Sequence, residues 1–239
     1  MCAARNPHRM LSALAAIGLT LTAGAYPFET PGAPNLEPPR NGKPYPPIMV
    51  PEGGDKLLSL DCPVTSSAGL NPERGEWAMI TDNDKETKSF DFHDECESLV
   101  KYAPGIQWLQ IDLRTSQVVN AVWIWSHHWY ISVYRDMVVQ LSNDADFIDG
   151  VTTVFNNDHD NSSGLGIGED KEYIETNYGR PIPVPGIRAR YVRVYSNGRY
   201  RGRVWNADNY CTEIEVYGGK PTSKEKVQIR PALPKPGFS

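Results

Sequence analysis

Residues 106–113 alternate between apolar and mostly polar side chains, and this alternation limits the possible folds more than any other feature of the sequence. Leu109, Ile111 and Leu113 fall on one face, whereas Gln110 and Asp112 fall on the other. A period of two residues is that of a β-strand with one buried face. Other strands must cover that apolar face, so the pattern predicts a β-rich domain.

Six further segments have the length and composition of strands. They are residues 57–60, 117–125, 136–142, 151–155, 190–196 and 212–218. Residues 117–125 are apolar on both faces, which is typical of a central strand. No segment has a sustained 3.6-residue period, and short strands separated by turn signals indicate an antiparallel sandwich or barrel. A domain of about 160 residues buries enough apolar surface to be stable without disulfides.

The first 25 residues have the pattern of a secretory signal peptide. Arg5 and Arg9 precede an uncharged apolar run that closes on the small residues Ala23, Gly24 and Ala25. The alternative, a membrane anchor, is disfavoured because the run is shorter than the ~20 residues that a spanning helix needs. We therefore expect a protein that is secreted, or located in the periplasm or cell envelope, with no membrane-spanning segment after cleavage.

The remaining chain divides by composition into three parts. Residues 26–55 are rich in proline and lack apolar periodicity, which predicts an extended linker or arm. Residues 56–219 are the β-domain, and residues 220–239 return to lysine and proline and are expected to form a flexible tail. The formal net charge is -5 and the charges are mixed along the chain. Without a basic block, nucleic acid is not an expected partner.

Aromatic and planar polar side chains gather in three loops between the expected strands. Sugar recognition needs flat rings for the sugar face and planar polar groups for the hydroxyls. The candidate ligand-binding residues are His127, His128, Trp129, Tyr130, Asn156, Asp158, His159, Arg199, Tyr200, Arg203 and Trp205. The alternative for Trp129 and Trp205 is that each packs beneath its own loop.

Two acidic stretches could surround a cation. Residues 82–87 place several oxygen ligands in a few residues, as calcium requires, but an ordinary acidic surface turn has the same composition. Residues 158–164 resemble a calcium loop in part. Their glycine falls one place later than in an EF-hand and no glutamate stands at loop position 12, which favours a hydrogen-bonded structural loop.

The series of strands resembles the discoidin, or coagulation factor 5/8 type C, family, to which the family 32 carbohydrate-binding modules belong. The resemblance covers roughly residues 56–219. It rests on five segments in order: Trp-Leu-Gln-Ile-Asp-Leu at 108–113, Ala-Val-Trp-Ile-Trp at 121–125, Val-Val-Gln-Leu-Ser at 138–142, Ala-Arg-Tyr-Val-Arg-Val-Tyr at 189–195 and Glu-Ile-Glu-Val-Tyr-Gly at 213–218. It implies a galactose-binding-domain-like jelly-roll β-sandwich with ligand loops at one end, and binding of carbohydrate or glycoconjugates rather than catalysis.

The resemblance also implies a structural calcium ion and suggests how the cysteines pair. Asp82, Asp84 and Thr87 match the family's metal turn, and Glu213 matches its glutamate on the last strand. Asn83 replaces the usual glycine, and asparagine tolerates the left-handed conformation. After signal removal Cys62, Cys96 and Cys211 remain, an odd number. Pairing of Cys96 with Cys211 is the first choice, Cys62 with Cys211 the second, and three reduced thiols the third.

Two other functions stay open from the sequence. The loops or the proline-rich arm could serve a protein-interaction or cell-envelope scaffold module. A glycosidase with two acidic residues is the enzyme to consider. No nucleophile elbow and no H-E-x-x-H motif is present, so we expect no catalytic activity.

Overall fold

The computed structural model describes residues 36–37, 40, 43–85, 98–128, 132–201 and 204–232, without the side chains of residues 201, 204 and 205. The predicted signal peptide and about half of the proline-rich arm lie outside these ranges. Among the described residues, no helix has the length and apolar character to cross a membrane.

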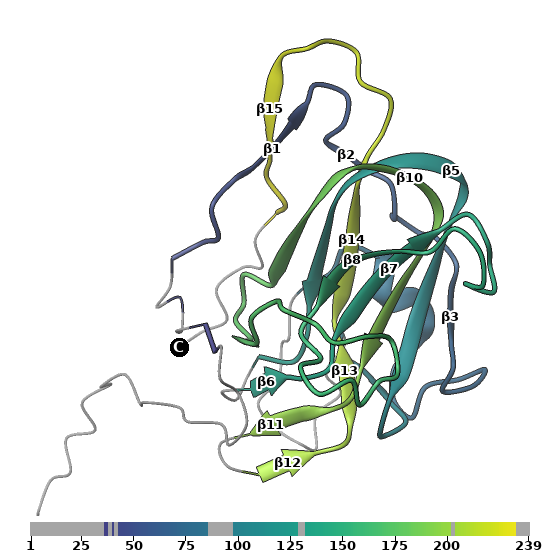
Figure 1. The fold of residues 1–239 in the computed structure, drawn as a ribbon, viewed down its shortest axis with the longest axis vertical. Helices are drawn as coiled ribbons and strands as arrows, with labels where there is room; N and C mark the ends of the chain where they lie inside the picture. The colour runs from purple at the N-terminus through teal and green to yellow at the C-terminus, as the bar shows by residue number, and fades with distance from the viewer. Residues whose placement is uncertain are drawn as a thin grey trace, which may run out of the picture.

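The described chain is almost entirely β-structure (Figure 1). The strands are β1 (Ile48–Pro51), β2 (Lys56–Leu57), β3 (Val64–Ser66), β4 (Val100–Tyr102), β5 (Gln107–Trp125), β6 (Ser132–Tyr134), β7 (Val138–Ser142), β8 (Thr152–Asn156), β9 (Tyr173–Ile174), β10 (Arg180–Ser196), β11 (Arg199–Arg201), β12 (Val204–Asn206), β13 (Asn209–Cys211), β14 (Glu213–Gly218) and β15 (Lys226–Ile229). One short 3-10 helix, η1, spans Trp77–Thr81.

Two long strands, β5 and β10, form the frame of the molecule and arch across it together (Figure 1). They pair antiparallel from Gln107 with Ser196 to Ile124 with Arg180. The first part of β5 also pairs with β3, and its last part pairs with β14, whereas the last part of β10 pairs with β7. The strand order is β2-β14-β5-β10-β7-β8. This is the predicted antiparallel jelly-roll β-sandwich.

The strand boundaries differ from the predicted ones at β5 and β10. Residues 107–113 and 117–125 belong to a single strand, in which Arg114 turns the chain with φ of +67° and pairing with β10 shifts register between Asp112 and Gln117. The predicted strand 190–196 is only the end of β10. Its first part contains Pro181, Pro183 and Pro185, which lack the N–H group that sheet pairing uses and therefore argue against a strand in sequence.

The main core lies between the two halves of the arched strands. It contains the alternating aliphatic residues that sequence periodicity singled out, including Leu109, Ile111, Ile124 and Val192, all at most 1% exposed. Burial of such side chains contributes about 1.5–3 kcal/mol each. The core therefore holds the frame on which the loops stand.

A second apolar cluster covers the outer face of β5 and β14. β1 and β15 form an antiparallel ribbon, in which Ile48 pairs with Ile229. Val50 and Ile229 from this ribbon pack against Trp123 and Trp125. The ribbon explains why both faces of residues 117–125 are apolar. It also corrects the expectation of a flexible tail, because residues 226–229 form a strand.

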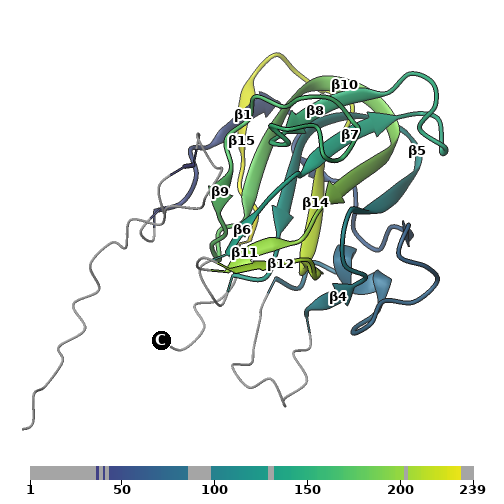
Figure 2. The same ribbon diagram turned by 60° about the horizontal axis from the view of Figure 1, so that its bottom comes forward.

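A small four-stranded sheet closes one end of the sandwich (Figure 2). Its order is β12-β11-β6-β9, with Tyr200 of β11 opposite Val133 of β6. The loop at residues 157–172 connects β8 to β9 and so reaches the same sheet. This end brings together several of the candidate ligand-binding residues.

Candidate functional site

Strand β11 sends its two predicted ligand-binding residues to opposite faces, because successive side chains of a strand alternate. Arg199 is only 4% exposed. Its Nη1 lies 2.7 Å from His127 Nδ1 and donates to Ser132 Oγ at 3.3 Å, and its guanidinium lies 4.3 Å from the ring centre of Tyr210. Arg199 is thus buried against the half-buried His127, and its guanidinium is not on an exposed binding surface.

On the other face of β11, Tyr200 contacts Arg135. Arg135 Nη1 donates to the Tyr200 hydroxyl at 3.3 Å, and the guanidinium lies 5.3 Å from the ring centre. Arg135 Nε also donates to Glu172 Oε1 at 2.8 Å. Arg135 keeps 17% of its side-chain surface exposed, whereas Glu172 is buried. We call Tyr200, Arg135 and Glu172 the Tyr200 face.

Electrostatics fix the Arg135 guanidinium in this position. Burial raises the pKa of Glu172, and the hydrogen bond from Arg135 opposes that rise. The pKa of Arg135 is raised, because the hydrogen bond and charge of Glu172 outweigh its partial burial. Sequence analysis missed both residues, since neither stands in a ring-rich loop or a motif. They meet only because β6 pairs with both β11 and β9.

The loop after β8 is held by its own hydrogen bonds. Asn156 Nδ2 donates to Gly166 O at 2.9 Å, and Asp158 accepts from the backbone N–H groups of Ser162 and Ser163 at 3.0 and 2.8 Å. A Cβ at Gly168 would lie 2.2 Å from Asn156 O, so only glycine fits there. Asn156 and Asp158 are buried and hold the loop together, consistent with the structural loop that the sequence favoured.

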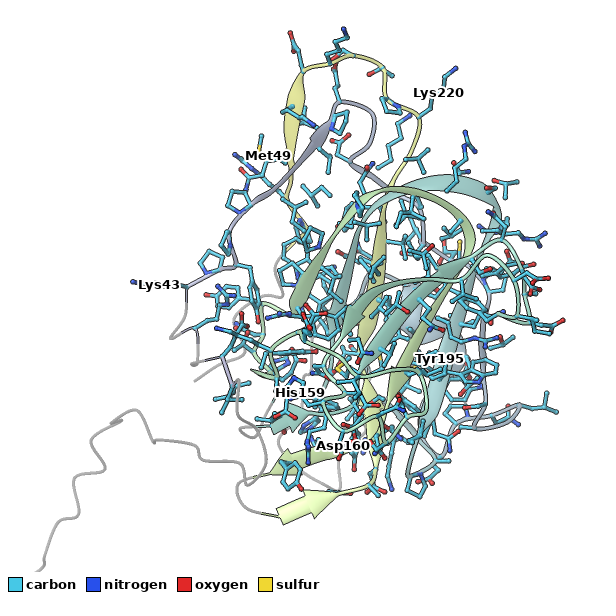
Figure 3. The ribbon with its side chains drawn as sticks, in the orientation of Figure 1. Lys43, Met49, His159, Asp160, Tyr195 and Lys220 are labelled. Atoms are coloured by element: carbon cyan, nitrogen blue, oxygen red, sulfur yellow. The ribbon has the colours of Figure 1, made fainter. Side chains whose placement is uncertain are left out.

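His159 and Asp160 lie next to each other at the end of the molecule that carries β6 (Figure 3). His159 is half-buried, and its Nε2 lies 2.8 Å from Asp170 O. Asp160 is exposed. His128 is half-buried, its Nδ1 lies 3.3 Å from Ser126 O, and burial lowers the pKa of its ring.

Four other predicted ligand-binding residues cannot be placed. Trp129, Tyr130 and Arg203 lie outside the described residues, as does the side chain of Trp205. In sequence, residues 129–130 directly precede β6 and residues 203–205 follow β11. They remain predicted ligand-binding residues.

Asp136, Asp158 and Asp160 form an acidic cluster that could hold a metal ion. Each has a carboxylate oxygen within 4.8 Å of one from the others. Asp136 is 5% exposed, and its Oδ1 has no hydrogen-bond partner among the described residues, while its Oδ2 accepts from Asn197 Nδ2 at 2.8 Å. Sequence analysis missed Asp136, because it lies 22 positions before Asp158 and outside the acidic stretch.

The turn at residues 82–87 has the predicted backbone, but a lysine occupies its centre. Asn83 has the expected left-handed conformation, with φ of +68°, and donates its N–H to Glu213 Oε2 at 3.2 Å. Asp84 N donates to Asp82 Oδ1 at 2.8 Å. Thr87 lies outside the described residues.

The Lys85 ammonium joins this turn to β14 through oxygens of Asn83 and Glu215. Its Nζ donates to Glu215 Oε1 at 2.6 Å and to Asn83 Oδ1 at 2.7 Å. Burial, and then the charge of Glu215, raise the pKa of Glu213 to about 9, whereas the charge of Lys85 opposes that rise. A positive charge thus lies close to Glu213, one of the residues that the resemblance assigns to calcium, and the calcium site at this turn stays a prediction.

The cysteines that the structure describes are free thiols. Cys62 and Cys211 are both buried. Cys211 Sγ points to the carbonyl of Trp125 at 3.6 Å, and burial raises the pKa of its thiol well above the usual value. Cys62 and Cys211 are therefore not bonded to each other, which corrects the second predicted pairing. The first, Cys96 with Cys211, falls on a residue that the structure does not describe and stays a prediction.

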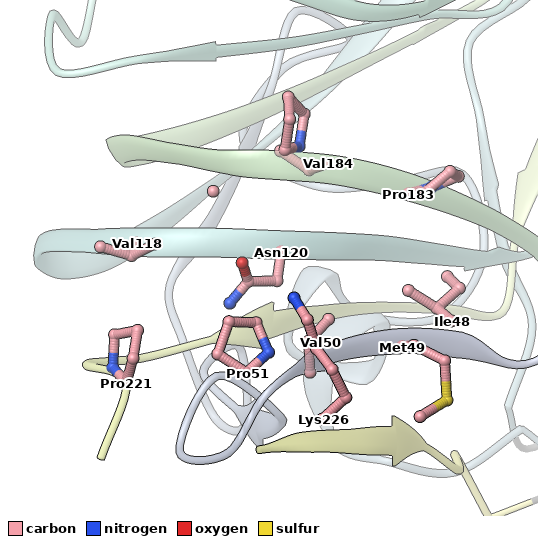
Figure 4. Close-up of a pocket in the computed structure, with 12 residues that line it drawn as sticks. Ile48, Met49, Val50, Pro51, Val118, Asn120, Pro183, Val184, Pro221 and Lys226 are labelled. Atoms are coloured by element: carbon pink, nitrogen blue, oxygen red, sulfur yellow. The ribbon is translucent and has the colours of Figure 1, made fainter. Parts of the chain in front are cut away.

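A groove of about 460 Å³ lies between the β1–β15 ribbon and the strands β5 and β10 (Figure 4). Its walls are mainly proline and valine, with Asn120 and Lys226 as the polar side chains. Asn120 Nδ2 already donates to Gly54 O at 3.0 Å. The groove lacks an aromatic ring and convergent polar groups, so it is a poor candidate for a sugar site.

No protein-family model and no curated protein matches the chain. Solved structures do. Chitosan-binding module 1 from a chitosanase/glucanase of Paenibacillus sp. IK-5 is 23% identical over 68% of this chain and 99% of its own, with a TM-score of 0.43. A family 32 carbohydrate-binding module of Clostridium perfringens, in complex with GlcNAc-α-1,4-galactose, is 16% identical over 68% and 94%, with a TM-score of 0.45.

A fucose-binding module of Streptococcus pneumoniae is 14% identical over 69% of this chain and 99% of its own, with a TM-score of 0.42. Each of these three structures is named as a module that binds a carbohydrate. The ligands in their names belong to those modules.

Proposed function

We propose that the chain is an exported, non-catalytic carbohydrate-binding module that binds its ligand at the Tyr200 face. The observation that carries the proposal is the Arg135 guanidinium, partly exposed beside a tyrosine ring and oriented by the buried Glu172 at 2.8 Å. A ring and a planar set of donors, fixed before binding, are the groups that recognise a sugar face and its hydroxyls.

The surroundings of the Tyr200 face support a preformed site. The loop after β8 is braced by its own hydrogen bonds, so ligand binding need not order it. Preorganisation of this kind lowers the entropic cost of binding. Trp129, Tyr130, Arg203 and Trp205 adjoin β6 and β11 in sequence, and we assign them to the same site. Export follows from the signal-peptide pattern of residues 1–25.

Replacement of Tyr200 by alanine should weaken glycan binding at least tenfold, because aromatic residues dominate the energetics of such sites. The purified chain is first screened on a glycan array, and the best ligand is then titrated calorimetrically against both proteins. Tyr191→Ala is the matched control, because Arg190 lies 4.9 Å from the Tyr191 ring in a similar arginine–tyrosine pair away from β11. An array without a hit, equal losses in both variants, or glycoside release by the chain would contradict the proposal.

We further propose that the acidic cluster of Asp136, Asp158 and Asp160 binds calcium. Its ligands are carboxylate oxygens, which calcium prefers, and the buried Asp136 Oδ1 lacks a partner among the described residues. A partnerless buried carboxylate oxygen is costly unless a cation or proton satisfies it. The position next to His159 places this ion near the candidate sugar site.

Calcium should therefore raise the melting temperature. At a calcium concentration of 100 Kd, binding adds about 2.7 kcal/mol to the free energy of unfolding. Asp160→Asn should abolish that shift without unfolding the protein, since Asp160 is exposed. Glu169→Gln, an exposed charge in the same loop, is the control. A calcium shift that survives Asp160→Asn, or no shift at all, would remove the cluster as a calcium site.

A further inference from the structure

The turn at Asn83 is joined to β14 by a fully bonded ammonium group. Lys85 is 3% exposed, and its Nζ lies 2.6 Å from Glu215 Oε1, 2.7 Å from Asn83 Oδ1 and 3.3 Å from Asn83 O. An ammonium carries three N–H donors, so these three oxygens satisfy it. The Nζ also lies 5.3 Å from the ring centre of Trp125, which adds a cation–π contact.

The two glutamates of β14 explain why a positive charge is needed here. Glu213 and Glu215 are each 1% exposed and two residues apart, so they project from the same face of the strand. Glu215 Oε2 accepts from the Tyr217 hydroxyl at 2.6 Å, and Glu213 Oε2 accepts from Asn83 N. Burying a carboxylate is very unfavourable unless a cation pairs with it.

We propose that the Lys85 ammonium replaces a bound metal ion as the cation that fastens the Asn83 turn to β14. Nζ donates to oxygens of both the Asn83 turn and β14, and Glu213, which the resemblance assigns to the ion, accepts from Asn83 N. The turn therefore keeps its conformation without calcium. The chain then departs from the calcium turn that the sequence resemblance implies by carrying the cation as a side chain, and the contact of this turn with β14 is independent of metal supply.

Replacement of Lys85 by methionine tests whether the ammonium stabilises the contact of the Asn83 turn with β14. Methionine fills a similar volume but leaves Glu215 buried without a cation, so the melting temperature should fall by about 10 °C. Lys101→Met is the control, because the Lys101 ammonium pairs with Glu73 at 2.8 Å while 30% exposed. Lys85→Met combined with Glu215→Gln should recover part of the loss. Equal melting temperatures for Lys85→Met and wild type would overturn the proposal.

Terbium luminescence tests whether the Lys85 ammonium takes the place of a metal ion at this turn. The experiment uses an Asp160→Asn background, so that failure of the calcium proposal above does not affect the result. In this background, wild-type Lys85 should give no luminescence sensitised by Trp125. Lys85→Ala frees the oxygens close to that ring and should produce a signal that Glu215→Gln removes. If the Lys85 protein itself gives a signal that Glu215→Gln abolishes, a metal displaces the lysine and the proposal is wrong.

If Lys85→Met and Lys85→Ala fail to fold, Glu215→Gln alone still decides. It keeps the ammonium and removes the charge of its strongest partner, so it should lower the melting temperature by several degrees in the presence and in the absence of calcium. A loss that appears only in calcium would show that Glu215 serves a metal instead.

Discussion

Exchange of Arg180 for methionine is expected to lower stability by about 3 kcal/mol, or about 6–12 °C in melting temperature. The Arg180 side chain is 12% exposed and pairs with Glu37 of the proline-rich arm. Its guanidinium lies 4.9 Å from the ring centre of Tyr173, 5.3 Å from that of Phe155 and 5.8 Å from that of Tyr45. Arg180 therefore joins the arm to β9 and to the core, and its loss breaks all of these contacts at once.

The arm should also become accessible to proteases in this variant. Glu37 N donates to Glu172 O at 2.8 Å, and Glu37 pairs with Tyr173 in a parallel bridge, so the arm is fixed beside the Tyr200 face. Limited trypsin digestion with mass spectrometry should show faster cleavage after Arg40 in Arg180→Met than in the wild type.

The same strand offers a control for this prediction. Arg190 makes a bidentate pair with Asp112, with both distances 2.8 Å, but its side chain is 41% exposed. Exposed pairs contribute about 0–1 kcal/mol, so Arg190→Met should change the melting temperature by a few degrees at most. If both variants melt alike and Arg40 is cleaved at the wild-type rate, Arg180 does not hold the arm.

Local patterns in the sequence predicted the central strands correctly, because a half-buried strand has apolar side chains at alternate positions. Leu109 and Ile111 show it on one face of β5, and the two apolar faces of residues 117–125 are both buried, one by the core and one by the β1–β15 ribbon. The left-handed Asn83 is a similar case, since its conformation follows from the residue type itself.

The features that the sequence missed depend on contacts between distant segments. β1 and β15 are far apart in the sequence, and each is only four residues long with proline or lysine within it. Neither strand has a pattern that predicts its partner. The Tyr200 face combines residues from β11, the β6–β7 turn and the segment before β9, so no single loop of the sequence predicts it.

The sequence also could not show which polar residues are internal. Arg199 and Tyr200 are neighbours in one predicted loop, yet pairing of β11 with β6 turns Arg199 inward and Tyr200 to the other side. In the sequence, Lys85 is an ordinary charged residue of an acidic turn. In the structure, its Nζ donates to Glu215 of β14. In both cases the partner, rather than the residue, decides the role.

Stability should fall as the pH rises above the ordinary glutamate range, and replacement of Glu175 by glutamine should remove part of that fall. Glu175 is 3% exposed, and its Oε2 has no hydrogen-bond partner among the described residues. Burial raises the pKa of its carboxyl well above the usual value, against the opposing hydrogen bond from Thr176 N and the charge of Arg180. The folded protein therefore keeps a proton that the unfolded chain, with an ordinary glutamate, has already lost.

Because the folded state binds the extra proton, raising the pH favours the unfolded state by about 1.4 kcal/mol per pH unit for each such group. The contribution is complete below the unfolded pKa and is lost as the pH rises toward the folded one. Glu213, whose pKa is raised to about 9, adds a second fall of the same sign. The wild type should thus lose several degrees of melting temperature between pH 7 and pH 8.

Groups with the opposite sign act outside this window. The pKa values of Asp112 and Asp158 are lowered, chiefly by hydrogen bonds from Arg190 and Ser163, so their stabilisation is lost only as the pH falls through the acidic range. Burial lowers the pKa of His128, so its effect is confined to pH values near and below the ordinary histidine range.

Glutamine keeps the shape of Glu175 and stays neutral, so Glu175→Gln should match the wild type at low pH and exceed it at pH 8. Thermal unfolding at pH 7.0, 7.5 and 8.0 compares the two slopes, with the exposed Glu169→Gln as a control that should leave the slope unchanged. If Glu175→Gln has the wild-type slope, Glu175 is ionised in the folded protein. Its charge would then be balanced by Arg180, and that arginine would serve the core as well as the arm.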